Sequence, residues 1–191
     1  MKTGTRDLWA TAEDEAKFVE IYRRYGKPIQ AYCARRTLGS QVEDAVAETF
    51  LVAWRRLGDV PDGAATLPWL YGVAYRVLSR QWRHKARSRR LLERLRGLAG
   101  EESMSPDVLL VRSEEYRVVL AASSRLHPID QEILRLTVWE ELSHADVAMV
   151  LGIEIGAVRQ RAYRARRNLT TEYNRLTKDR QPPAAQKGGG S

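Results

Sequence analysis

Near the C-terminal end, cationic and amide side chains recur with the spacing of one helix face. At about 100° per residue, one side of the segment 156–167 carries Arg159, Gln160, Tyr163, Arg164 and Arg167. An arginine can donate two hydrogen bonds to guanine and a glutamine can pair with adenine, while further arginines neutralise phosphates. Solvated helix faces usually mix charges, and this segment contains no acid. The pattern therefore favours contact with DNA over a plain solvated surface.

The residues around this face predict a helix-turn-helix. Ser143 can cap a first helix, with Asp146 three residues on, and Gly152 can end it in a left-handed conformation. A second helix then begins near Ile155 or Gly156. We expect its other side to face the core through Val158, Ala162, Ala165 and Leu169. A preceding helix, Pro128 to about Trp139, would supply apolar support from Ile129, Ile133 and Leu136.

A second cationic face is predicted in a helix that begins with Pro68 in its first turn. Four apolar residues of this helix would face inward: Leu70, Val73, Ala74 and Val77. The remaining side combines an aromatic ring with three arginines: Trp69, Gly72, Arg76, Ser79, Arg80 and Arg83. Unstacked bases bind such surfaces because they stack on rings while arginines follow the backbone. For Trp69 itself, an ordinary core position fits the pattern equally well.

A third helix, within residues 42–57, offers an acidic face. Its buried stripe is predicted to be Val42, Val46, Phe50, Ala53 and Leu57. Its other side presents Asp44, Glu48, Leu51 and Arg55. Two carboxylates one turn apart beside an exposed leucine could dock on a basic, grooved partner, since apolar contact supplies affinity and charge supplies orientation. A plain exposed face is equally compatible with these residues.

Helical periodicity dominates the 191 residues, and we predict an all-α fold of two small helical domains joined by a flexible linker. Breaks at 26–28, 38–40 and 58–63 leave room for four helices in the first domain. The expected divisions are an N-terminal tail (1–12), a first domain (13–87), a linker (88–111), a second domain (112–173) and a disordered tail (174–191).

The composition narrows the function classes. Lys and Arg number 32 against 24 acids, for a net charge of +8, which indicates a polyanionic partner. The lone Cys33 excludes an internal disulfide and fits a buried, inert thiol. The sequence shows no phosphate-binding glycine loop and no metal-ligand spacing, so we expect no catalytic residue, metal or cofactor. Without a signal peptide or a long apolar run, a cytoplasmic protein is expected.

Together the segments DAVAETFLVAW, LPWLYGVAYRVLSRQWR and LSHADVAMVLGIEIGAVRQRAYRARRNL resemble the sigma factors of the extracytoplasmic-function (ECF) group, within the sigma-70 family. The resemblance runs from about Phe18 to Leu169, with the three motifs in the family's order and spacing. It implies a region 2 domain, a region 4 domain and a non-enzymatic role in transcription initiation. An anti-sigma factor is a common partner in this family.

The resemblance also assigns roles. Asp44 and Glu48 would meet the clamp helices of the largest subunit of core RNA polymerase, although Ala47 stands where a glutamine is common. The loop Asp59–Thr66 would capture a flipped minus-ten base, with Trp69 at the edge of the melted DNA. Arg76 and Arg80 replace the Asn and Asp of many relatives. Arg159, Gln160 and Arg164 match the residues with which the family recognises the minus-thirty-five element. A helix-turn-helix regulator that does not join polymerase is the alternative.

Overall fold

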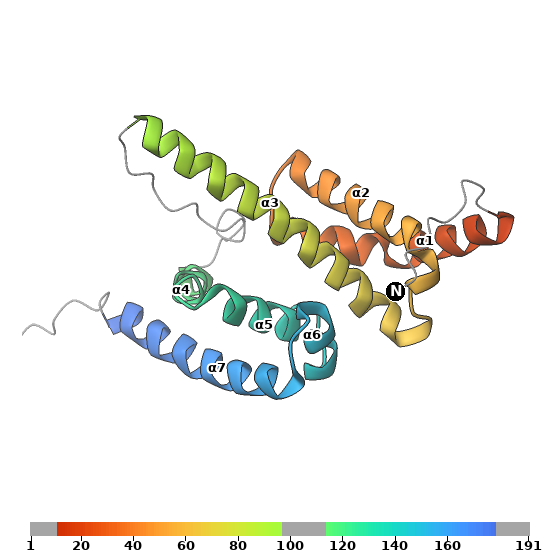
Figure 1. Ribbon diagram of the computed structural model, residues 1–191. Coiled ribbons are helices and arrows are strands. Elements are labelled where there is room, and N and C mark those ends of the chain that lie inside the picture. Colours follow the sequence, from red (N-terminus) through yellow and green to blue (C-terminus); the bar gives the residue numbers. More distant parts are fainter. Residues whose placement is uncertain (1–10, 97–113, 179–191) are drawn as a thin grey trace, which may run out of the picture.

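A computed structural model describes residues 11–96 and 114–178, and this part of the chain consists of helices joined by turns, with no strand (Figure 1). The first domain consists of α1 (Ala12–Ala34), α2 (Ser40–Arg55), two short 3-10 turns, η1 (Leu57–Asp59) and η2 (Gly63–Ala65), and the long α3 (Thr66–Arg96). The second consists of α4 (Glu114–Ser123), α5 (Pro128–Val138), α6 (His144–Leu151) and α7 (Ile155–Lys178). The all-α prediction is confirmed.

Helix α1 runs without interruption through the predicted break at 26–28, so that break is wrong. The described first domain accordingly has three α-helices and two 3-10 turns instead of four helices. Thr11 caps α1 in a capping box with Asp14. Pro28 lies inside the helix and lacks the N–H that would bond to the preceding turn. Beyond it, Ile29 and Tyr32 are fully buried, and their burial keeps the chain helical against that local cost.

The other two predicted breaks are present. Gly39 has a φ of 60° directly before α2, and Gly63 has a φ of 68° at the start of η2. These positive φ values favour glycine because it has no Cβ to clash with the backbone. The second break turns the chain from α2 into α3.

Buried stripes along the helices of the first domain agree well with the expected periodicity. All four inward positions predicted for α3 are buried. In α2, Phe50 and Ala53 are buried, whereas Val42 and Val46 are only partly so. Ala45 and Thr49 take the most buried positions, and the Thr49 hydroxyl donates to the Ala45 carbonyl at 2.7 Å. This bond satisfies the hydroxyl, so a polar residue can occupy the core.

The second domain follows the predicted helix-turn-helix. Val158, Ala162 and Ala165 are fully buried and Leu169 is partly buried, as the stripe requires. Ile133 and Leu136 of α5 are also fully buried beneath the pair. Helix α7 continues to Lys178, past the expected end of the domain at residue 173.

The two domains pack against each other, with α6 on the flank of α3 (Figure 1). One core cluster contains Leu70 and Tyr71 of α3 together with Ile133 and Val150 of the second domain. Helix α3 extends to Arg96 and so includes the start of the predicted linker. The remaining linker prediction and both expected tails fall mainly outside the described residues. Among the described helices, none combines the length and apolar character needed to cross a bilayer.

Candidate nucleic-acid interface

The predicted DNA-reading side of α7 is exposed along its whole length. All five residues are accessible, and Tyr163 keeps 63% of its surface. The Arg167 guanidinium lies 6.0 Å from the centre of the Tyr163 ring. Because the opposite side of α7 packs into the core, this face points away from the domain. The face consists of Arg159, Gln160, Tyr163, Arg164 and Arg167.

Two arginines outside this face are paired with acids. Arg161 donates to Asp130 of α5 at 2.9 Å, and Arg175 pairs with Glu172 at 3.2 Å. Within the described residues, by contrast, Arg159, Arg164 and Arg167 have no acidic partner, and neither does Arg166 beside the face. Their charge is therefore available to phosphates or base edges.

Capping at the turn fixes the direction of α7. The Ser143 hydroxyl accepts from the Asp146 N–H at 3.1 Å, which starts α6 at His144. Gly152 ends α6 with a φ of 66°, in the left-handed region. The predicted cap and stop are both present, and they place the N-terminal half of α7 at the surface.

The second predicted face, on α3, is only partly accessible. Arg76, Arg80 and Arg83 are exposed, Ser79 and Trp69 are half-buried, and Gly72 is buried. Trp69 is half-buried and packs against the core, which fits a packing role, and its contact with DNA stays a prediction. The Arg83 side chain bonds to the Ser79 carbonyl at 3.1 Å.

Arg56, which the sequence reasoning missed, joins this face from the end of α2. Its guanidinium lies 5.8 Å from the centre of the Trp69 ring and pairs with Asp59 at 2.9 Å. Burial and the charge of Arg56 lower the pKa of Arg76 from its ordinary value. The concentration of positive charge beside an indole is a suitable site for an unstacked base and its phosphate.

The acidic face of α2 is largely open. Asp44, Leu51 and Arg55 are exposed, and Leu51 keeps 46% of its surface. Glu48 is half-buried because it forms an ion pair with Arg80 of α3. The structure thus connects a residue expected to meet polymerase with one expected to meet DNA.

A pocket of about 260 Å³ lies between α1 and the 59–66 loop. Lys17, Arg24 and Tyr25 line one side, and Asp62 and Thr66 line the other. Lys17 pairs with Asp62 at 3.2 Å. The Thr66 hydroxyl donates to the carbonyl of Pro61 at 2.7 Å, which holds the loop in its bend. The α1 residues were not among the predicted site residues, because only the fold brings them beside this loop.

Two family models match the chain, and they match its two domains. Sigma-70 region 2 covers residues 21–88, and sigma-70 region 4 covers residues 116–169. The chain therefore belongs to the sigma-70 family, within its ECF group.

Individual relatives agree with that assignment. A probable RNA polymerase sigma factor, RfaY, of Xanthomonas campestris is 36% identical over 68% of this chain. The ECF RNA polymerase sigma factor BldN of Streptomyces coelicolor is 33% identical over 84% of this chain. The chain spans 33% of the length of RfaY and 61% of that of BldN.

Solved structures of sigma factors share the fold, and one of them illustrates the match. This example is the sigma factor RpoE of Bartonella quintana, in complex with the anti-sigma factor NepR. The two chains superpose with a TM-score of 0.60 at 19% identity, covering 89% of this chain and 100% of that chain.

Proposed function

We propose that this chain is an RNA polymerase sigma factor of the ECF type. It binds core polymerase, recognises the minus-ten and minus-thirty-five promoter elements, and promotes DNA melting. The observation that carries the proposal is the exposed face of α7, whose three arginines have no acidic partner among the described residues, whereas Arg161 and Arg175 of the same helix do. A free cationic face on the second helix of a helix-turn-helix fits the major groove.

Each of the three faces binds a different partner in this proposal. The α7 face reads the minus-thirty-five element, with Arg159, Gln160 and Arg164 toward base edges and Tyr163 and Arg167 beside them. The α3 face binds melted minus-ten DNA through Trp69, Arg76, Ser79, Arg80 and Arg83. The α2 face binds the clamp helices of the largest polymerase subunit through Asp44, Glu48, Leu51 and Arg55.

Melting needs no catalysis in this proposal. Flipping a base costs a few kcal/mol of unstacking. Stacking on Trp69 and phosphate contacts with the neighbouring arginines offset that cost, since each stacked base contributes about 1–3 kcal/mol. The open pocket beside the 59–66 loop is the proposed place for one extruded base. The protein then acts in the cytoplasm without cofactor or metal.

An anti-sigma factor is a further proposed partner. The RpoE structure is a complex with such a protein, and it shares the two-domain fold. A regulator that binds DNA without joining polymerase is less favoured, because the region 2 model covers residues 21–88, outside the helix-turn-helix.

Complex formation with polymerase tests the proposal. The full chain is mixed with bacterial core RNA polymerase and sedimented through a glycerol gradient. Co-migration at one chain per core enzyme is the expected result. A chain that stays at the top of the gradient while still binding duplex DNA would establish the regulator alternative instead.

A further inference from the structure

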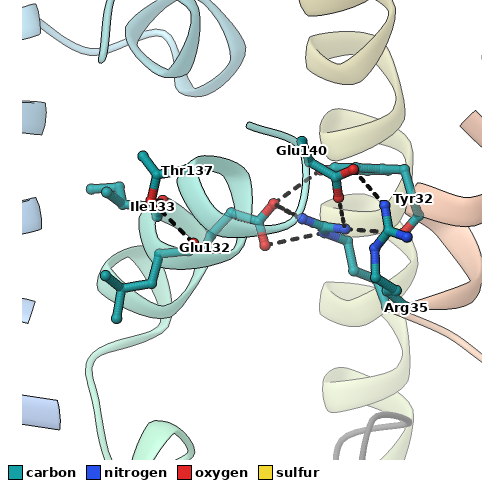
Figure 2. Close-up of polar contacts among 8 residues, drawn as sticks. Tyr32, Arg35, Glu132, Ile133, Thr137 and Glu140 are labelled. Atoms are coloured by element: carbon teal, nitrogen blue, oxygen red, sulfur yellow. Dashed lines mark hydrogen bonds and ion pairs between the residues drawn. The ribbon is translucent and has the colours of Figure 1, made fainter. Parts of the chain in front are cut away.

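A buried polar cluster joins the two domains (Figure 2). The Arg36 side chain, which follows α1, is fully buried between Glu132 of α5 and Glu140, just after α5. Its Nε donates to the two Glu132 oxygens at 3.0 and 3.2 Å, and its Nη1 donates to Glu140 at 3.1 Å. Tyr32 donates to Glu132 at 3.1 Å, and Arg35 pairs with Glu140.

The charges of this cluster divide strictly by domain. Arg35 and Arg36 belong to the first domain, and Glu132 and Glu140 belong to the second. Burial alone would lower the pKa of Arg36, but the neighbouring tyrosine and the two carboxylates raise it above its ordinary value. Each domain alone would carry two adjacent like charges. The cluster is neutral only while the domains touch.

An apolar contact lies beside the cluster. Gly72 of α3 approaches the backbone of Val150 in α6 so closely that an added Cβ would lie 3.5 Å from the Val150 Cα and carbonyl oxygen. Val150 is 1% exposed, in the core cluster that spans both domains. Gly72 lies on the side of α3 that carries Trp69 and Arg76. The contact therefore covers part of the proposed minus-ten face.

The cluster can separate at modest free-energy cost. Buried ion pairs recover their hydration when they are parted, so the gain from pairing is largely offset by desolvation. One donor gains nothing in the closed state, because Arg35 Nε is buried without a hydrogen bond. Arg36 Nη2 also lacks a hydrogen bond, but it is ion-paired with Glu132 at 2.9 Å. Such a contact sets a specific closed geometry more than it adds stability.

The closed geometry conflicts with the proposed promoter contacts. The minus-ten and minus-thirty-five elements are named for positions about 25 base pairs apart. At 3.4 Å per base pair, that separation is about 85 Å of DNA. A compact chain of this length has a radius of gyration of about 16 Å. A chain with its domains packed together cannot occupy both elements.

We propose that Arg36, Glu132 and Glu140 form an interdomain lock, which keeps the free chain closed until core polymerase separates the domains. This inference rests on the proposed sigma function for its purpose, but the lock itself is a property of the free chain.

Small-angle X-ray scattering of the full chain without polymerase tests the lock. In the double variant Glu132→Gln, Glu140→Gln, the radius of gyration should rise by roughly 5 Å as two compact domains move apart. Circular dichroism should show unchanged helix content. Glu141→Gln, next to the lock but exposed, is the matched control and should stay compact. An unchanged radius in the double variant would overturn the lock.

A second variant opens the interface without altering charge. Gly72→Leu places a side chain against Val150 and should expand the chain in the same way. Gly156→Leu is its control, because a Cβ at Gly156 meets nothing within 4 Å. If the double variant loses its helices, a compact Gly72→Leu chain refutes the lock and an expanded one supports it. Because no polymerase is present, failure of the sigma assignment in the gradient experiment leaves this result unaffected.

Discussion

Glu48 of α2 and Arg80 of α3 form an ion pair across the first domain, so the acidic face and the cationic face are joined through their own functional residues. A partner that attracts Glu48 would release Arg80 to bind phosphate. The pair is partly solvated, so its own contribution to stability is small.

The exposed acid Asp44 tests the α2 face without disturbing this pair. Asp44→Arg should weaken binding to core polymerase about tenfold, or about 1.4 kcal/mol, because a repulsive charge faces a basic partner. Fluorescence anisotropy of a labelled chain measures the affinity. Glu141→Arg makes the same charge change in the second domain and should bind like the wild type. Equal affinities for the two variants would remove the α2 face from the polymerase interface.

Substitutions on α7 separate base reading from general attraction. Arg159→Ala and Arg164→Ala should each cost about 1–3 kcal/mol of affinity for a cognate minus-thirty-five duplex. Arg166→Ala removes the same charge from a residue outside the predicted face and should cost much less. Titrations at fixed salt measure the loss of affinity of each variant for the cognate duplex and for a scrambled duplex. A loss that is the same on both duplexes would assign these arginines to phosphates alone.

Trp69 should contribute to melting through its accessible ring. Trp69→Ala should reduce open-complex formation by about 1–3 kcal/mol, while Trp69→Phe, which keeps a ring, should lose less. Permanganate reactivity of unpaired thymines measures the opening. Trp82→Phe, another partly buried tryptophan of α3, is the control for packing. If Trp69→Ala melts DNA as well as the wild type, Trp69 is only a packing residue.

Alanine substitutions at Gly152 and Gly156 test the backbone conformation assigned to the turn between α6 and α7. Gly152→Ala forces a Cβ into a left-handed conformation, with a φ of 66°, and should lower the free energy of unfolding by about 1 kcal/mol. Gly156→Ala lies in the first turn of α7 in open space and should raise it by a few tenths of a kcal/mol, about 0.5 at most, since the full gain applies to helix interiors. Urea denaturation measures both. A stabilised Gly152→Ala would contradict the assigned turn.

Burial raises the pKa of the Cys33 thiol to about 11, above its ordinary value of 9.0. Because the folded state holds the proton more tightly, this thiol's contribution is complete below pH 9 and is lost as the pH rises toward 11. Stability should therefore fall over that window, and Cys33→Ala should show a smaller fall. Urea midpoints at pH 8 and pH 10.5 make the comparison. Parallel losses in both chains would show that Cys33 does not titrate with unfolding.

Much of the site was predictable because it depends on local spacing. The period of 3.6 residues separates the buried stripe of α7 from its arginine face, and local rules identify Ser143 and Gly152. The same rules failed at Pro28, because burial of Ile29 and Tyr32 outweighs the local preference for a break. Long-range burial is not visible in a short window of sequence.

The interdomain features were beyond sequence reasoning for a related cause. Arg36 and Glu132 lie 96 positions apart, and nothing in either local pattern distinguishes them from surface charges. The sequence pattern puts Gly72 on the open side of α3, but α6 covers that position. Arg56 follows the end of α2, where helical periodicity no longer assigns a direction.

Transcription from promoter DNA tests the central claim most directly. Core polymerase and the full chain are incubated with a library of genomic promoter fragments, and run-off transcripts are sequenced. Start sites that share two upstream elements, and that disappear with the variant Arg159→Ala, Arg164→Ala, are the predicted result. Transcripts no different from those of core polymerase alone, across the library, would contradict the account.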